Sequence, residues 1–133
     1  MRKRKSKRSR LIRECDALFA RLIRLKRGGR CEYCGKIPKP RGLHLHHIFS
    51  RRCLRTRWDE RNVVLLCFHC HRFVAHSSVA GFREWAEVRL GPTEWALLTL
   101  EYQKGKPVKI HQLELQRRIL EFQIQEVDSG GHK

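Results

Sequence analysis

At 133 residues the chain supports one folded domain, and its net charge of +17 indicates a polyanionic partner, with DNA or RNA as the expected classes. The sequence excludes a membrane span, because no apolar run approaches the roughly 20 residues that a span requires. Charged residues also interrupt the stretch after the basic N-terminus, so we expect no signal peptide and a cytoplasmic protein with reduced thiols.

The first ten residues, MRKRKSKRSR, contain seven Lys or Arg. We expect residues 1–10 to form a disordered basic arm whose cations, Arg2, Lys3, Arg4 and Lys5 among them, contact DNA phosphates rather than base edges. From Leu11 to Leu25 apolar residues recur at steps of three and four, which predicts an amphipathic helix with Ser9 as its N-cap and Gly28 and Gly29 as its stop. Cys15 lies in the apolar stripe of that helix, so we expect it in the core.

Residues 30–42 predict a turn-rich knuckle, because Gly35 can adopt a positive φ and both Pro38 and Pro40 exclude regular strand pairing. The knuckle contains one of two Cys-x-x-Cys pairs, which are separated by 32 residues. Four thiolates at this spacing predict a tetrahedral structural Zn²⁺ on Cys31, Cys34, Cys67 and Cys70. The alternative is four free or buried cysteines, and Cys53 is expected to be a loop residue outside the site.

Two short strands are predicted at 43–49 and 63–66, followed by a helix from about 68 to 76. Side chains alternate along a strand, so the adjacent imidazoles of His46 and His47 point to opposite sides of the first one. Hydrolysis of a phosphodiester needs a base with a pKa near neutral and a divalent cation. We therefore expect His46 to be a metal ligand and His47 the general base. His44 shares the face of His46 and contacts metal, DNA or solvent.

His71, at the start of the helix after the second cysteine pair, is the expected second ligand of the catalytic metal. His76 is a candidate third ligand, although five residues do not return to the same face of an α-helix. Asn62 is expected either to hold the loop or to accept the Nδ1 proton of His47, which would leave Nε2 as the base.

The loop between the two strands is rich in arginine. We expect its guanidinium groups to clamp phosphates and to stabilise transition-state charge, and the alternative is a solvated basic loop. The loop residues expected to bind DNA are Arg51, Arg52, Arg55 and Arg57.

Three more helices are expected at about 78–90, 92–103 and 111–126. The apolar positions of the last one fit either core packing or a homodimer interface. The expected organisation is therefore a basic arm (1–10), a single domain (11–127, with its core at about 31–76 and C-terminal helices at about 78–126) and a disordered tail (128–133).

The arrangement of His47, Asn62 and His71, the last directly after Cys70, resembles the HNH endonuclease pattern of the ββα-metal nucleases over residues 31–76. The resemblance implies an α+β fold, with a small ββα-metal core stapled by a four-cysteine zinc and surrounded by additional helices. It also implies that His46, His47, Asn62 and His71 form the catalytic site. Many HNH proteins have Asp at the position of His46 and Asn at that of His71, so an all-imidazole site is expected to favour Mn²⁺, Ni²⁺ or Zn²⁺ over Mg²⁺.

A longer string, His-x-x-Ser-Arg followed by Thr-Arg-Trp-Asp-Glu-Arg-Asn-Val between His47 and Val63, resembles the phage NinG or Rap recombination endonucleases. The segments DALF (16–19), Leu-Gly-Pro (90–92) and Lys-Pro-Val-Lys (106–109) extend this resemblance to most of the chain. It implies metal-dependent cleavage of double-stranded or branched DNA, such as Holliday junctions, in a phage or prophage setting, with phage recombination or packaging proteins as partners.

The alternative is a noncatalytic, zinc-stabilised nucleic-acid-binding module or a phage packaging accessory protein. Such a module explains the charge and the cysteines equally well. It does not explain why two histidines, an asparagine and a further histidine occupy the nuclease positions.

Overall fold

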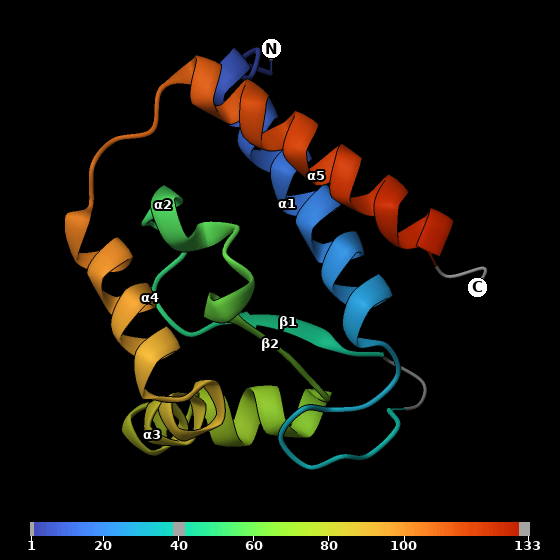
Figure 1. Cartoon of the computed structure of the whole chain (residues 1–133), viewed down its shortest axis with the longest axis vertical. Helices are drawn as coiled ribbons and strands as arrows, with labels where there is room; N and C mark the ends of the chain where they lie inside the picture. Colours follow the sequence, from blue (N-terminus) through green and yellow to red (C-terminus); the bar gives the residue numbers. More distant parts are fainter. Residues whose placement is uncertain (1, 39–41, 131–133) are drawn as a thin grey trace. The chain divides into compact units, whose positions relative to one another are not determined.

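The computed structural model describes residues 2–38 and 42–130, which form two compact units. One unit, here called the central unit, spans Gly29–Lys106, and the other, here called the helical pair, combines the chain up to Gly28 with the chain from Pro107 onward. Helices with a two-stranded sheet confirm the α+β class (Figure 1). Pro40, which was expected to interrupt pairing in the knuckle, lies outside the described residues.

The helical pair consists of α1 (Lys7–Arg27) and α5 (Ile110–Gly130), which lie side by side and run in the same direction (Figure 1). Their contact surface is apolar, and the buried residues are Leu11, Cys15, Phe19, Leu22 and Ile23 of α1 with Leu113, Leu120 and Ile124 of α5. The Cys15 thiol donates to the carbonyl of Leu113 at 3.7 Å, and burial, reinforced by Asp16, raises the pKa of Cys15 to about 11. Cys15 is therefore a core residue, as predicted.

Both helices extend beyond their predicted ends. α1 begins at Lys7 rather than near residue 11, and its N-cap is Ser6, whose hydroxyl accepts from the backbone N–H of Ser9 at 3.1 Å, so Ser9 is not the cap. Lys and Arg are good helix formers, so the basic segment continues the helix once a cap satisfies its first N–H groups. α5 likewise continues to Gly130, and the start of the expected tail is therefore helical.

Strands β1 (His44–His47) and β2 (Val63–Leu66) pair antiparallel, with His44 opposite Leu66 and His47 opposite Val63. All four residues of β2 are buried, as expected for a strand covered on both faces. The bounds of β2 match the prediction, whereas β1 is shorter than the expected 43–49.

Beyond the end of β1, hydrogen bonds to Asn62 take the place of the strand-to-strand hydrogen bonds. Its backbone carbonyl accepts from the N–H of Ile48 at 2.8 Å, its Oδ1 accepts from the N–H of Phe49 at 2.7 Å, and its Nδ2 donates to the carbonyls of Phe49 and Thr56 at 3.2 and 2.9 Å. The side chain is 0% exposed. This amide closes a loop that the sequence did not predict to be helical but that contains α2 (Leu54–Arg57) and a 3₁₀ turn (Glu60–Asn62).

A π-helix, η2 (Cys70–Ala75), and helices α3 (Val79–Leu90) and α4 (Pro92–Lys104) complete the central unit. The bounds of α3 and α4 agree with the prediction to within one residue. Phe49 stacks on Tyr102 of α4 with ring centroids 4.6 Å apart, which attaches the end of the β1 segment to that helix. None of the helices in the described part of the chain has the length and hydrophobicity needed to cross a membrane.

We predict that Asn62→Ala lowers the free energy of unfolding by about 2–4 kcal/mol, because it leaves buried backbone groups of Phe49 and Thr56 without partners. Urea unfolding measures the change. The exposed amide of Gln123 provides the control, since Gln123→Ala is expected to change stability by less than about 0.5 kcal/mol. Equal effects of the two substitutions would contradict this role of Asn62.

Candidate functional site

Four cysteines from two distant segments form one cluster. The sulfur atoms of Cys31, Cys34, Cys67 and Cys70 all lie within 4.8 Å of one another, with Cys34 and Cys67 3.9 Å apart. Two sulfurs bound at 2.3 Å to one tetrahedral zinc would be about 3.8 Å apart. All six cysteines of the chain are free thiols, so the cluster is not a pair of disulfides. The donor set therefore fits a tetrahedral thiolate-bound metal ion.

Local hydrogen bonds shape the two cysteine turns. In the first, the N–H of Gly35 donates to the carbonyl of Cys31 at 2.9 Å, and Gly35 has a φ of 76°, the positive value predicted for it. In the second, the N–H of Cys70 points at the sulfur of Cys67 at 3.4 Å. Backbone N–H groups directed at sulfur favour the thiolate, the form that binds metal.

Glu32 attaches the first cysteine turn to the sheet. Its N–H donates to the carbonyl of Leu65 at 2.9 Å, and its carboxylate accepts from the N–H of Leu65 and pairs with Arg89 of α3. The edge of β2 therefore fixes the position of Cys31 relative to Cys67, which follows that strand.

The pKa values of two of the cysteine thiols, Cys31 and Cys70, are consistent with a site for a bound cation. Burial raises the pKa of Cys31, but hydrogen bonds from the backbone of Cys34, Cys67 and Tyr33 outweigh it and lower the pKa to about 7. Burial and the neighbouring thiols raise the pKa of Cys70 well above its usual range. The four sulfurs can therefore all ionise only when a positive ion lies among them.

Three imidazoles form a second cluster. Nitrogen atoms of His46, His71 and His76 lie within 4.8 Å of one another, and the Nε2 atoms of His71 and His76 are 3.0 Å apart. Two nitrogens bound at 2.1 Å to one ion at a right angle would also be about 3.0 Å apart. The structure thus brings together the three histidines that were predicted as ligands, in a geometry that fits a divalent ion.

The π-helix explains why His76 joins His71. Five residues do not return to one face of an α-helix, which was the objection to His76 as a ligand. Over η2 the chain winds more widely, with i→i+5 hydrogen bonding, so residues five apart come to lie above one another. π-Helical turns are found frequently at functional sites.

Burial favours the neutral form of His46 and His71. It lowers the pKa of His46 to about 4, with a smaller contribution from the charges that His71, His76 and His47 would carry, and it also lowers the pKa of His71. At neutral pH both rings therefore present a lone pair, the form in which imidazole binds a metal. His44 lies outside this cluster but stacks on His71, with ring centroids 5.1 Å apart and planes 10° apart, so it orients that ring.

The tautomer of His47 differs from the prediction. Its Nε2 lies 2.8 Å from the backbone carbonyl oxygen of Arg57. A carbonyl only accepts, so this bond assigns the proton to Nε2 and leaves the ring's lone pair on Nδ1. Of the two roles expected for Asn62, acceptance of a proton from Nδ1 with Nε2 as the base does not fit, because the amide of Asn62 bonds Phe49 and Thr56 instead.

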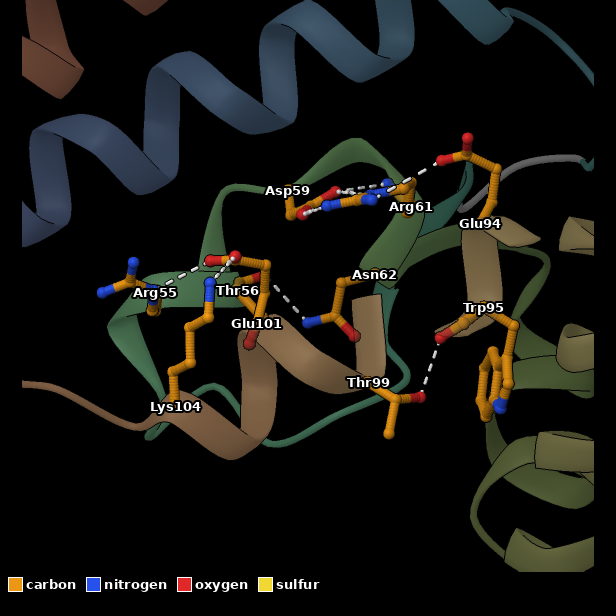
Figure 2. A network of polar contacts seen from close by, with 10 residues as sticks. All are labelled: Arg55, Thr56, Asp59, Arg61, Asn62, Glu94, Trp95, Thr99, Glu101 and Lys104. Atoms are coloured by element: carbon orange, nitrogen blue, oxygen red, sulfur yellow. Dashed lines mark hydrogen bonds and ion pairs between the residues drawn. The ribbon is translucent and has the colours of Figure 1, made fainter. Parts of the chain in front are cut away.

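Asn62 therefore performs the other predicted role, that of holding the loop. Its Nδ2 bonds the carbonyl of Thr56, one residue before the carbonyl of Arg57 that orients His47 (Figure 2). Asn62 thus holds the backbone next to the carbonyl that His47 contacts.

The loop arginines are partly engaged within the protein. Arg55 donates to Glu101 at 2.8 Å, and Lys104 bonds the same carboxylate at 2.9 Å (Figure 2). These hydrogen bonds, first that of Lys104, lower the pKa of Glu101 to about 2. Arg57 donates to the carbonyl of Arg51 at 2.9 Å.

Of the remaining expected DNA contacts, Arg51 and Arg52 are exposed at the turn that follows β1. Arg2, Lys3, Arg4 and Lys5 are exposed ahead of α1.

Arg83 was not predicted. It lies on α3, and its guanidinium stands 4.8 Å from the centroid of the Phe49 ring and donates to the carbonyl of Ile48 at 3.4 Å, directly after His47. No motif marks this residue, because only the folded position of α3 brings it to the end of β1.

We predict that Cys34→Ser abolishes binding of the structural metal and lowers the melting temperature, because ligation and folding are coupled in small sites. Cys34 is exposed, so the loss would reflect ligation rather than core packing. Cys53→Ser, outside the cluster, is the control and should retain the metal. Metal content by mass spectrometry and thermal unfolding test this, and a Cys34→Ser protein with normal metal content and stability would contradict it.

Comparison with known families supplies the last finding. No curated protein and no solved structure matches the chain. Residues 31–75 match the sequence model of the HNH endonucleases, a range that includes both cysteine pairs, β1, β2 and η2. Residues 31–75 are thus similar in sequence to an HNH endonuclease domain.

Proposed function

We propose that this protein is a metal-dependent DNA endonuclease that hydrolyses phosphodiester bonds. The observation that carries the proposal is the position of His47 on the strand beside the three-histidine cluster, with its Nε2 bonded to a carbonyl. This contact supports an oriented ring with its lone pair on Nδ1, and imidazole is the side-chain type best suited to act as a general base near neutral pH.

In this mechanism Nδ1 of His47 accepts a proton from the attacking water. Nε2–H keeps its bond to the carbonyl of Arg57, which orients the ring and stabilises the positive charge that the ring gains. Asn62 holds that carbonyl in place through the neighbouring Thr56. Strand alternation directs His46 to the opposite side of β1 from His47, so the base and the metal ligand have separate positions.

His46, His71 and His76 would hold the catalytic ion. A divalent ion there would stabilise the negative charge that develops on the phosphate and on the departing 3′ oxygen. A set made only of imidazoles favours Mn²⁺, Ni²⁺ or Zn²⁺ over Mg²⁺, which prefers oxygen ligands. The four cysteines would hold a separate structural Zn²⁺.

Exposed cations would hold the DNA backbone. The exposed Arg51 and Arg52 follow the base by a few residues, and Arg2, Lys3, Arg4 and Lys5 add a basic segment ahead of α1. Such contacts position a substrate without reading its sequence.

For the substrate we propose branched DNA intermediates of recombination, in a phage or prophage context and in the host cytoplasm. The support is the resemblance of the segment from His47 to Val63 to the phage NinG or Rap endonucleases. A protein that recognises DNA by shape through phosphate contacts also suits such a substrate.

We predict that His47→Ala reduces cleavage of supercoiled plasmid by a factor on the order of 10²–10⁴, the range typical for loss of a general base. DNA binding and metal content should remain unchanged, because His47 is outside both clusters. The exposed His111 provides the control variant, His111→Ala. Cleavage is measured with added Mg²⁺, Mn²⁺, Ni²⁺ or Zn²⁺, and full activity of His47→Ala would refute the assignment.

The same assay on a labelled four-way junction and a matched linear duplex tests the substrate. Preferential cutting of the junction would support recombination intermediates, whereas equal rates would argue against them and leave a general DNA nuclease.

We predict that deleting residues 2–5 weakens binding to all DNA sequences alike. Ser6 must be kept because it caps α1. Each phosphate contact that is lost should reduce the slope of log K against log [salt] by about 0.9. Fluorescence anisotropy at several salt concentrations measures the slope, and an unchanged slope would show that the arm does not contact DNA.

A further inference from the structure

The charges of the helical pair are divided between its two faces. α1 contains eight Lys or Arg but two acidic residues, whereas α5 is the more acidic helix. Ion pairs join the two helices, namely Lys7 with Glu114 at 2.7 Å, Arg117 with Glu14 at 2.8 Å and Arg21 with Asp128 at 3.7 Å. The acidic groups in these pairs are thus held at the seam between the helices.

The opposite face of α1 is cationic. At 100° per residue, Arg10, Arg13 and Arg24 lie on the side of the helix away from the buried stripe that contacts α5, and all three are exposed. The positions between them on this face are Ala17 and Ala20, whose side chains are small. The face thus has arginines toward both ends, and the small side chains between them leave the helix backbone accessible.

This spacing fits a groove of DNA. Arg13 and Arg24 are eleven residues apart, or about 16 Å along the helix, whereas the major groove of B-DNA is about 12 Å wide. The arginines at the two ends could therefore reach the phosphates of the two strands that border the groove, while the alanines let the helix backbone approach between them.

We propose that this face of α1 is a second DNA-binding surface, which lies across the major groove and contacts phosphates through Arg10, Arg13 and Arg24. The proposal rests on the proposed function for the identity of DNA as the partner. The five named positions of the face include no large apolar side chain, so the face does not fit a lipid surface. The deep, narrow major groove of double-stranded RNA does not admit a helix, which favours DNA.

The contact should not depend on sequence, because an alanine methyl group forms no hydrogen bond to a base edge. The cations of this face would increase the affinity for DNA and its salt dependence beyond those of the central unit alone. The helical pair would then retain DNA while the central unit cuts it.

The test compares two triple variants with equal net charge, both in the His47→Ala protein so that DNA stays intact. Arg10→Gln, Arg13→Gln and Arg24→Gln remove the cationic face, whereas Lys7→Gln, Arg21→Gln and Arg117→Gln remove three cations of the seam. Gln has a helix propensity close to that of Arg and Lys, so both proteins should stay helical, and circular dichroism verifies this. Binding of a labelled duplex is measured by anisotropy from 50 to 200 mM salt.

The face variant should reduce the slope of log K against log [salt] by about 2.7, which is 0.9 for each lost phosphate contact, and the seam variant by less than about 1. Equal changes in the two variants would overturn the proposal, since net charge alone would then explain binding. A wild-type protein that does not bind duplex DNA would overturn it too. Tighter binding to double-stranded RNA than to DNA would likewise count against the groove geometry.

Two further substitutions test the close approach of the helix. Ala17→Glu places a carboxylate in the middle of the face, and Gln125→Glu adds the same charge at an exposed position of α5. We expect the first to weaken DNA binding at least tenfold more than the second, and similar effects would overturn the geometry. Changing the three arginines to lysine should retain most of the slope, because lysine also contacts phosphate.

Failure of this inference and failure of the proposed function have different signatures. The binding slopes are measured in a protein that lacks its general base, so they do not depend on catalysis. Absence of His47-dependent cleavage would refute the nuclease and leave the slopes to decide on the α1 face. Normal cleavage with equal slopes would refute the α1 face alone.

Discussion

The antiparallel pairing of β1 with β2 is the constraint on which the candidate site depends. β2 is buried along its whole length, and the pairing sets His44 opposite Leu66 and His47 opposite Val63. That register directs His46 and His47 to opposite sides of β1. One end of the pair is tied down by the cysteine cluster that follows Leu66, and the other by the buried amide of Asn62. The proposed metal ligand His46 and the proposed general base His47 are thereby adjacent in sequence but directed apart.

The helix after β2 has to satisfy two demands that an α-helix cannot meet together. Its first turn must direct Cys70 to the cysteine cluster, while His71 and His76 must both face His46. The wider π-helical winding meets both, because it brings residues five apart onto one face. An isolated segment would prefer the α-helix, so contacts with the rest of the central unit must stabilise the π turn. Cys70 belongs to the cysteine cluster and the adjacent His71 to the histidine cluster. We infer that one ion bound in each cluster would further stabilise the π turn.

Those parts of this organisation that depend on residues close together in the sequence could be predicted. The bounds of β2, α3 and α4 follow from apolar periodicity and from Gly91-Pro92, and the cysteine cluster follows from spacing alone. What could not be predicted depends on contacts between distant segments. α2 forms inside a loop closed by Asn62, the tautomer of His47 is set by a carbonyl ten residues away, and the π turn contradicts the ordinary helical period. α1 starts at Lys7, earlier than predicted, because the Lys and Arg that suggested a disordered arm are also good helix formers.

A net charge of +17 predicts a polyanionic partner but not where that partner binds. In the folded chain several of the cations are paired with carboxylates, so the net charge does not identify the binding surface. In the central unit, Arg55 and Lys104 share Glu101, and Arg61 is held by Asp59 and Glu94 (Figure 2). The paired carboxylates largely neutralise these cations and so weaken their attraction for a phosphate. In the helical pair the acids at the seam neutralise cations of the contacting sides and leave the outer face of α1 positive. Exposed ion pairs of this kind contribute little stability, so their main effect here is on the distribution of charge over the surface.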